Sequence, residues 1–185
     1  MTTAATQSSP TTVWKMDPAH SRAEFKIRHM MISNVKGSFS GLSGTLLENT
    51  TDHSWSEIDA SIDISTLNTG DAQRDTHLKS VDFFHQEQHP AMTFKSTTVE
   101  KKGNEEYSVT GDLTIHGITK VVTFAVEGPS APGKDPYGNT RIGLSATTKI
   151  NRKDFGLTWN AALETGGVLV GEDVQIVLDV QFIRA

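Results

Sequence analysis

Apolar and polar residues alternate one by one along most of this chain, and no other feature constrains its fold as strongly. Between residues 22 and 29, Ala23, Phe25, Ile27 and His29 fall on one side, and charged residues occupy the positions between them. A period of two is typical of a β-strand with one buried and one exposed face. The same pattern returns in further segments: 57–64, 92–98, 107–115, 142–150 and 174–182.

Turn signals separate these segments at short intervals. KKGNEE at 101–106 and HGITK at 116–120 predict tight turns, and the Pro/Gly-rich stretch 128–139 predicts a longer loop. Glycines at 37, 41 and 44 interrupt another apolar set, which indicates the bulges and coiling that let a sheet close on itself. About eight strands joined mostly by short turns predict an all-β antiparallel sheet, folded as a sandwich or a closed barrel.

The residues that face inward bear on whether the interior is packed or hollow. An eight-stranded barrel is wide enough to be filled by its own side chains or to hold one small ligand. The inward set includes many small residues: Ala23, Gly37, Ala60, Ser96, Thr98, Gly111, Ala146 and Thr148. Because small side chains leave room, we favour a barrel with a hollow apolar lumen over a packed one.

Length and composition narrow the domain organisation and the partners. The 185 residues predict one barrel domain at 13–185 after a flexible tail, 1–12, rich in Thr, Ser and Ala. The net charge of -5 opposes binding to nucleic acid or to an anionic membrane. No stretch approaches the ~20 apolar residues of a membrane span. The absence of cysteine excludes disulfides and thiol chemistry.

The first residues lack both a basic and an apolar signal region. We therefore expect a cytoplasmic protein, or a periplasmic one if a native leader has been removed.

The stretch QRDTHLKSVDFFHQEQHP, residues 73–90, breaks the alternation. Asp75 and Lys79 have the spacing of a helical ion pair, and Asn68 or Thr69 can cap the start of a helix. Pro90 disfavours helix at the residue before it. We predict a short helical cap around residues 70–88 that lies across one mouth of the barrel.

The predicted barrel and cap suggest two groups of candidate site residues. Apolar inward-facing residues and one histidine form the predicted ligand-binding wall of the lumen and mouth: Phe25, Ile27, His29, Phe39, Ile62, Ile64, Leu78, Phe83, Phe84, Phe94, Leu113, Ile115, Phe124, Leu144 and Trp159. Polar residues of the cap and of a strand end are candidates for an ion-pair network that pins the cap to the barrel: Arg74, Asp75, His77, Arg152 and Asp154. Independent solvated charges are the alternative to the network, because surface ion pairs are weak.

Histidines invite metal and catalytic interpretations. His85 and His89 are four residues apart, but the HExxH order is absent and Pro90 ends any helix they would share, so we predict no metal site. His20 and His77 are expected to form structural hydrogen bonds at the barrel ends. His29 fits an interior hydrogen bond, contact with a ligand head group, or metal ligation. No nucleophile elbow, P-loop or dinucleotide fingerprint is present, and we predict no catalytic residue.

Five segments in series resemble the YceI-like family of lipocalin-like polyisoprenoid-binding proteins. They are DPAHSRAEFKIRHMMISNVKGSFSGLSG (17–44), RDTHLKSVDFF (74–84), HPAMTFKST (89–97), VTGDLTIHGITKVVTF (109–124) and INRKDFGLTW (150–159). The resemblance covers nearly everything after the first dozen residues. The resemblance implies an all-β fold, an extended eight-stranded antiparallel lipocalin-like β-barrel with a helical segment beside its mouth. It also implies a bacterial carrier that holds a quinone or polyprenyl tail in its lumen.

Three functions stay open at this point. The favoured one is non-catalytic binding, storage or transport of a long-chain isoprenoid lipid, with no required cofactor and no nucleic-acid partner. The second is an enzyme that acts on an apolar substrate in the same lumen, with His29 or His77 as acid or base. The third is a sheet-mediated homodimer or stress-response scaffold to which lipid is incidental.

Overall fold

The alternating segments form the strands of one antiparallel sheet in the computed structural model, which describes residues 10–185. The strands of this part of the chain are β1 (Thr11–Met16), β2 (Arg22–His29), β3 (Ser33–Phe39), β4 (Leu42–Asn49), β5 (Trp55–Asp63), β6 (Ala91–Lys101), β7 (Glu106–Ile115), β8 (Ile118–Glu127), β9 (Gly133–Lys134), β10 (Thr140–Asn151) and β11 (Val170–Arg184). The helices are α1 (Ala72–Lys79) and the 3₁₀ turns η1 (Pro18–His20), η2 (Ile64–Thr66) and η3 (Arg152–Phe155).

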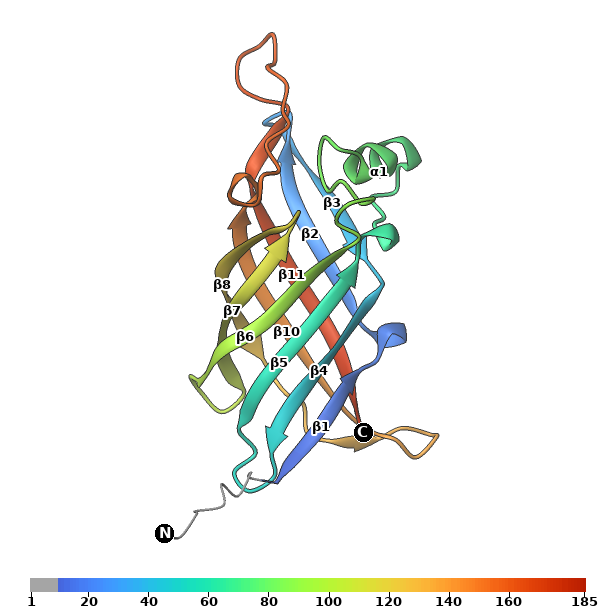
Figure 1. The fold of residues 1–185 in the computed structure, drawn as a ribbon, viewed down its shortest axis with the longest axis vertical. Coiled ribbons are helices and arrows are strands. Elements are labelled where there is room, and N and C mark those ends of the chain that lie inside the picture. Colours follow the sequence, from blue (N-terminus) through green and yellow to red (C-terminus); the bar gives the residue numbers. More distant parts are fainter. Residues whose placement is uncertain (1–9) are drawn as a thin grey trace, which may run out of the picture.

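The sheet closes on itself at β11. This long strand pairs with β10 along one edge, and with β2 and then β1 along the other. β2 pairs with β3, and β1 pairs with β4. In the barrel, β1 and β2 together therefore serve as one long strand, and β3 and β4 together serve as its neighbour. Counted so, residues 10–185 form a closed eight-stranded antiparallel barrel (Figure 1), which confirms the predicted barrel and excludes the sandwich.

The β7–β8 hairpin shows how the sequence sets the turns. His116 and Gly117 connect the two strands with φ of 53° and 72°. Two consecutive positive φ values are what a two-residue type I′ turn requires, and this turn matches the right-handed twist of the strands it joins. The tight turn predicted from HGITK is therefore confirmed.

A β-bulge corrects the inward set that alternation predicted for β6. The register opposite β7 shifts between Ser96 and Thr98, because the bulge places an extra residue in β6. Thr98 is consequently exposed, and Val99 packs against the core instead. The prediction that Thr98 faces the lumen was wrong.

Bulky aromatic side chains fill the barrel at the end where β1 begins. Trp14, Trp55 and Tyr107 are all buried, and the rings of Trp55 and Tyr107 stack with centroids 4.2 Å apart. The indole Nε1 of Trp14 donates a 2.6 Å hydrogen bond to Glu48. This aromatic plug closes one end of the interior.

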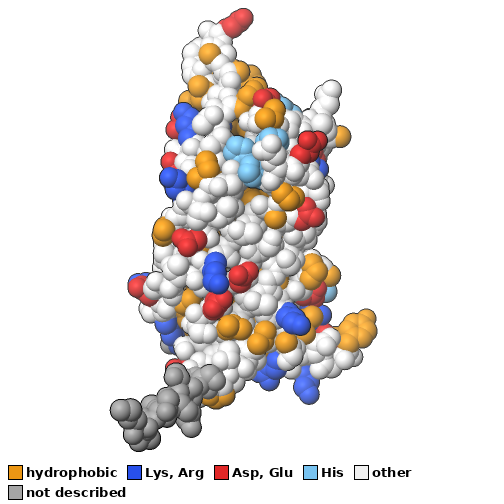
Figure 2. Space-filling model, in the orientation of Figure 1, with side chains coloured by type: hydrophobic (Ala, Val, Ile, Leu, Met, Phe, Trp, Pro, Cys, Tyr) orange, Lys and Arg blue, Asp and Glu red, His pale blue; other side chains and the backbone are white. Residues whose placement is uncertain are grey.

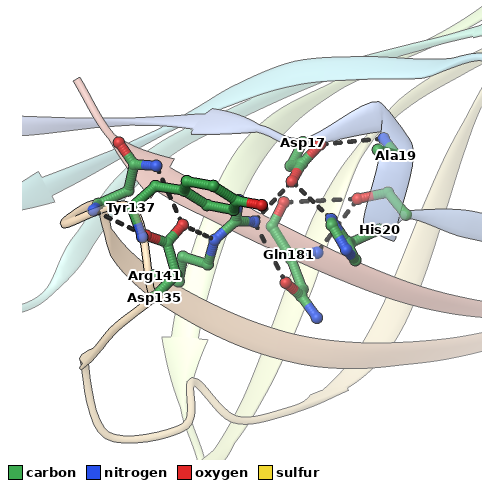
Figure 3. Close-up of polar contacts among 9 residues, drawn as sticks. Asp17, Ala19, His20, Asp135, Tyr137, Arg141 and Gln181 are labelled. Carbon is green, nitrogen blue, oxygen red and sulfur yellow. Dashed lines mark hydrogen bonds and ion pairs between the residues drawn. The ribbon is translucent and has the colours of Figure 1, made fainter.

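A polar network ties the β1–β2 junction to the strands that close the barrel. Arg141 of β10 contacts Asp17 at 2.5 Å and Asp135 at 2.6 Å (Figure 3). Asp17 also accepts a hydrogen bond from the backbone N–H of Ala19, and its carboxylate lies 2.8 Å from Nδ1 of His20. His20 thus has the structural hydrogen bond that was predicted for it.

The predicted helix is present as α1, but its cap differs from the prediction. The carboxylate of Asp71 accepts the hydrogen bond from the N–H of Arg74 and is the N-cap, whereas Asn68 and Thr69 lie before the cap. The helix lies beside β3 at the end of the barrel away from the C-terminus (Figure 1). Hydrogen-bonded turns follow it as far as Pro90.

Of the predicted tail, residues 1–9 lie outside the described residues, and Thr11 and Thr12 already belong to β1. No helix within residues 10–185 has the length and apolar character needed to cross a bilayer.

Candidate functional site: an apolar lumen

A cavity of about 330 Å³ occupies the barrel above the aromatic plug. Its wall extends from Met16 and Leu46, beside the plug, to Phe83 and Trp159 at the end that carries α1. The volume lies within the roughly 300–1,000 Å³ of ordinary ligand cavities. The interior is therefore hollow, as the small inward residues predicted.

Most of the predicted wall residues line this cavity. They are Phe25, Ile27, His29, Phe39, Ile62, Leu78, Phe83, Phe84, Phe94, Leu113, Ile115, Phe124, Leu144 and Trp159. Ile64 does not line it: β5 ends at Asp63, and η2 then turns Ile64 into the core, where it is 1% exposed. Alternation beyond a strand end carries no information about direction, which is why this prediction was wrong.

The sequence analysis left out the part of the wall that β11 contributes. Five alternate residues of this strand line the cavity: Val174, Ile176, Leu178, Val180 and Phe182. Their period-two alignment is the same signal that identified the other strands. They could have been included on that ground alone.

Aromatic pairs give the lumen a fixed shape. Phe39 lies between Phe25 and Phe84, with ring centroids at 5.9 and 6.0 Å, and it meets Phe84 edge to face. Across the barrel, Phe94 and Phe124 form a second edge-to-face pair at 5.1 Å. Such pairs have preferred geometries and hold their rings in place. The wall is apolar along most of its length, and aromatic rings packed in these geometries form much of it.

The mouth is built around a cluster of three rings. The imidazole of His77 packs edge to face against Phe83 and Trp159, with centroids at 5.2 and 4.9 Å. Its Nε2 lies 2.8 Å from the carboxylate of Asp82, which fixes the orientation of the ring. Leu78, Phe83 and Phe84 line the cavity. They therefore face the lumen, as was predicted for the cap.

The ion-pair network expected at the mouth does not form among the described residues. Arg74 donates to the carbonyl and the hydroxyl of Thr69, each at 2.8 Å, and Asp75 accepts from the N–H and hydroxyl of the same residue. Both charged side chains therefore hold the turn that precedes their own helix. Asp154 is exposed and forms no ion pair with Arg152.

Arg152 is buried, and backbone carbonyls take the place of a carboxylate partner. The side chain is 3% exposed, and it donates to the carbonyls of Leu157, Trp159, Val170 and Gly171. Burial lowers the pKa of this guanidinium below its ordinary value, while the nearby charge of Glu172 acts in the opposite direction. Arg152 thereby holds the segment that carries Trp159 against the start of β11.

A histidine cluster lies near the mouth but outside the lumen wall. His85, His89 and His116 place one ring nitrogen each within 4.8 Å of one another. His85 and His89 share one hydrogen-bonded turn before β6, and His116 stands in the turn after β7. Figure 2 shows histidine side chains, in pale blue, gathered at this end of the molecule.

The third histidine is what the sequence analysis missed. β6 and β7 pair with Thr93 opposite Thr114, so residues just before β6 lie beside residues just after β7. That pairing could have brought His116 into consideration. Its Nδ1 is buried and has no hydrogen-bond partner among residues 10–185, although the backbone of Phe155 lies near the ring. Burial lowers the pKa of His116, and the charge of His89 lowers it further.

Comparison with known proteins agrees with this fold. The family model of the YceI-like domain matches residues 14–182. The UPF0312 protein SA2479 of Staphylococcus aureus is 40% identical over 172 residues, which cover 92% of this chain and 97% of the relative.

Solved structures of similar proteins have the same fold. A Campylobacter jejuni YceI protein has 32% identity and a TM-score of 0.71, over 86% of this chain and 91% of its own. Burkholderia cenocepacia BcnA has a TM-score of 0.76 at 23% identity, over 90% and 98% of the two chains. A polyisoprenoid binding domain from Saccharophagus degradans has a TM-score of 0.66 at 18% identity, over 93% and 98%. The last two identities are low enough that these structures show the fold alone. With a family model across the whole barrel and a relative of 40% identity, the chain belongs to the YceI-like family.

Proposed function

We propose that this protein binds a polyisoprenoid lipid, of the quinone or polyprenyl type, with the tail in the lumen and the head group at the mouth. The observation that carries the proposal is the shape and lining of the cavity. It is apolar along the barrel, it is closed by the aromatic plug at one end, and its polar lining residues stand mostly at the other: Arg28, His29, Arg74, His77 and Arg152.

The physical match is between an apolar tube and a tail that is apolar throughout. Burial of such a tail contributes about 25 cal/mol per Å² before the costs of ordering the chain. The aromatic pairs hold the wall in place, so little further order is lost when the tail enters. The polyisoprenoid binding domain from Saccharophagus degradans is an example of this fold in a protein of that binding class.

The rim of the mouth supports exchange of this lipid with a bilayer. The β2–β3 turn exposes Met30, Met31 and Ile32, the last with 76% of its surface accessible. The N–H of Met30 donates to the carbonyl of Leu169, a residue of the lumen wall, so the turn adjoins the cavity. Contiguous exposed apolar side chains are costly in water and mark sites of interaction. In this proposal the protein is a non-catalytic carrier or store that needs no cofactor.

Native mass spectrometry of the full chain, purified without detergent and then extracted with organic solvent, tests the proposal. We expect an isoprenoid lipid in the extract, at up to one molecule per chain. Apo protein is then mixed with a long-tailed isoprenoid quinone and, as the control, with the free head group lacking its tail. Binding of the quinone and not of the head group supports the proposal. Lipid-free protein that also rejects the quinone contradicts it.

A further inference from the structure

The histidine cluster differs from three of the other four histidines of the chain. His20, His53 and His77 each have a ring nitrogen within 2.9 Å of a carboxylate oxygen. The rings of His85, His89 and His116 instead face one another, with centroids between 5.0 and 6.5 Å apart. Among residues 10–185, no ion pair with a carboxylate engages any of these three rings.

Two features of the local structure hold these rings together. The N–H of His89 donates a 2.9 Å hydrogen bond to the carbonyl of His85, so both side chains leave the same turn. Gly117 lets the ring of His89 approach the β7–β8 turn, because a Cβ at Gly117 would lie 2.8 Å from that ring. The cluster therefore joins two segments that are far apart in the sequence.

We propose that His85, His89 and His116 bind a divalent transition-metal ion, with Zn²⁺ as the expected occupant. Three imidazoles with no carboxylate are a donor set that suits zinc, copper and nickel and not the hard ions magnesium and calcium. A tetrahedral zinc with bonds of about 2.0–2.1 Å separates its ligand nitrogens by roughly 3.4 Å. The ring nitrogens already lie within 4.8 Å of one another, so they need to approach by at most about 1.4 Å to reach that separation.

The surroundings fit a bound ion of this kind. All three side chains are half-buried, so the site is shielded and yet reachable from solvent. A three-histidine set leaves a fourth position for water or for an external ligand.

The ion would tie the cap segment to the barrel. His85 directly follows Phe83 and Phe84, two residues of the mouth, and His116 belongs to the β7–β8 turn. A metal bound to all three would restrict movement of the segment 80–90 relative to the sheet. The site does not depend on the proposed lipid, because none of its ligands lines the lumen.

The test is calorimetric titration of Zn²⁺ into the full chain, carrying no affinity tag and freed of metal with a chelator. We expect one ion per chain, and a loss of affinity of at least about tenfold in His85→Asn and in His116→Asn. Asparagine is chosen because His85 and His116 have φ of 49° and 53°, a region that asparagine tolerates. His53→Asn is the matched control, since His53 has φ of 56° and lies exposed, outside the cluster.

Thermal unfolding supplies a second readout that separates metal binding from folding. Both cluster variants should unfold cooperatively without metal, and Zn²⁺ should raise the unfolding temperature of the wild type and of His53→Asn but not of the variants. The proposal is overturned if the wild type binds no Zn²⁺, if either cluster variant binds as the wild type does, or if His53→Asn loses as much affinity as they do.

Discussion

Arg152 shows how a single buried cation can organise the mouth of a barrel without a counter-ion. Its guanidinium has five N–H donors in a fixed plane, and four carbonyls from two separate segments accept from them. Arg152 thus places a positive charge at the mouth and at the same time gives hydrogen-bond donors to these backbone carbonyls, which need partners where they are shielded from water.

Replacement of Arg152 by Ala should destabilise the protein markedly. The change removes the donor to the carbonyls of Leu157, Trp159 and Gly171, which are buried or partly buried. We therefore expect the free energy of unfolding to fall by about 2–4 kcal/mol, and lipid retention to fall with it. Urea denaturation measures the first effect. The control is Lys153→Ala, next in sequence, whose exposed side chain pairs with Glu172 at the surface and should cost less than about 1 kcal/mol. Equal stability of the two variants would remove Arg152 from this role.

The carboxyl of Asp17 should make the stability of the fold depend on pH in the acid range. Its hydrogen bonds with Arg141 and His20 hold its pKa at about 2, below the ordinary value of 3.8. A carboxyl whose pKa is lower in the folded state stabilises the fold above pH 3.8, and this contribution is lost as the pH falls from there towards 2. Asp135, which also bonds to Arg141, has its pKa lowered in the same direction.

The corresponding experiment compares Asp17→Asn with the wild type across this range. The variant should be the less stable of the two at neutral pH, and the difference should shrink between pH 4 and pH 2. Denaturant unfolding at each pH measures it, with the exposed Asp154→Asn as control. A difference that stays constant with pH would show that the charge of Asp17 contributes nothing.

For single elements, the sequence predicted the strands well. It predicted poorly which way side chains point at a bulge or just beyond a strand end. Alternation identified the strand that became β2 and the neighbours that pair with it, because one buried face imposes a period of two. It failed at Thr98, where a bulge reverses the alternation, and at Ile64, where the strand has already ended. Both failures arise from backbone pairing, which a local pattern does not contain.

The cap was predicted in kind but not in its contacts. Helix propensity indicated where the cap lies, and Pro90 indicated where it ends. The aromatic residues Phe83 and Phe84 indicated the face that meets the lumen. The expected ion pairs do not form because Arg74 and Asp75 instead bond to Thr69, in the turn just before their helix. The histidine cluster was missed because its third member is brought in by the pairing of β6 with β7.

The β2–β3 turn should control the rate of lipid exchange and not the affinity. Replacing Met31 and Ile32 by Ser removes exposed apolar surface at the rim while leaving the lumen wall unchanged. We expect transfer of an isoprenoid quinone from phosphatidylcholine vesicles to slow at least about fivefold, because less apolar area contacts the bilayer. Tyr137→Ser, at an exposed loop that lines no part of the lumen, is the control. Unchanged transfer rates would show that this turn plays no part in exchange.

At the scale of the whole molecule, the closed barrel explains why one surface serves as both core and candidate ligand wall. A closed sheet has no free edge, and its stability comes from burial of one face. At the plug end Trp14, Trp55 and Tyr107 fill the interior, whereas beyond it small residues such as Ala23 and Ala146 leave space. The difference between plug and lumen is thus a difference in side-chain volume along the same strands.

Much of this architecture could be predicted from the sequence. The number of alternating segments and their short turns indicated the antiparallel barrel, and the small inward residues indicated the cavity. The position of the plug could not be predicted, because it depends on the register that stacks Trp55 on Tyr107 across the sheet. Register is a property of paired strands, and alternation in one strand leaves it open.

If the lumen holds the lipid tail, a bulky side chain introduced inside the barrel should block binding, whereas the same side chain on the outside should not. Ala146 of β10 lines the lumen, whereas Ala125 of the neighbouring strand β8 faces outward. Binding of a long-tailed isoprenoid quinone is measured by native mass spectrometry for the wild type, Ala146→Phe and Ala125→Phe. We expect Ala146→Phe, which puts a bulky ring into the cavity, to weaken binding at least about tenfold, and Ala125→Phe to bind as the wild type does. Full binding by a folded Ala146→Phe protein would contradict it.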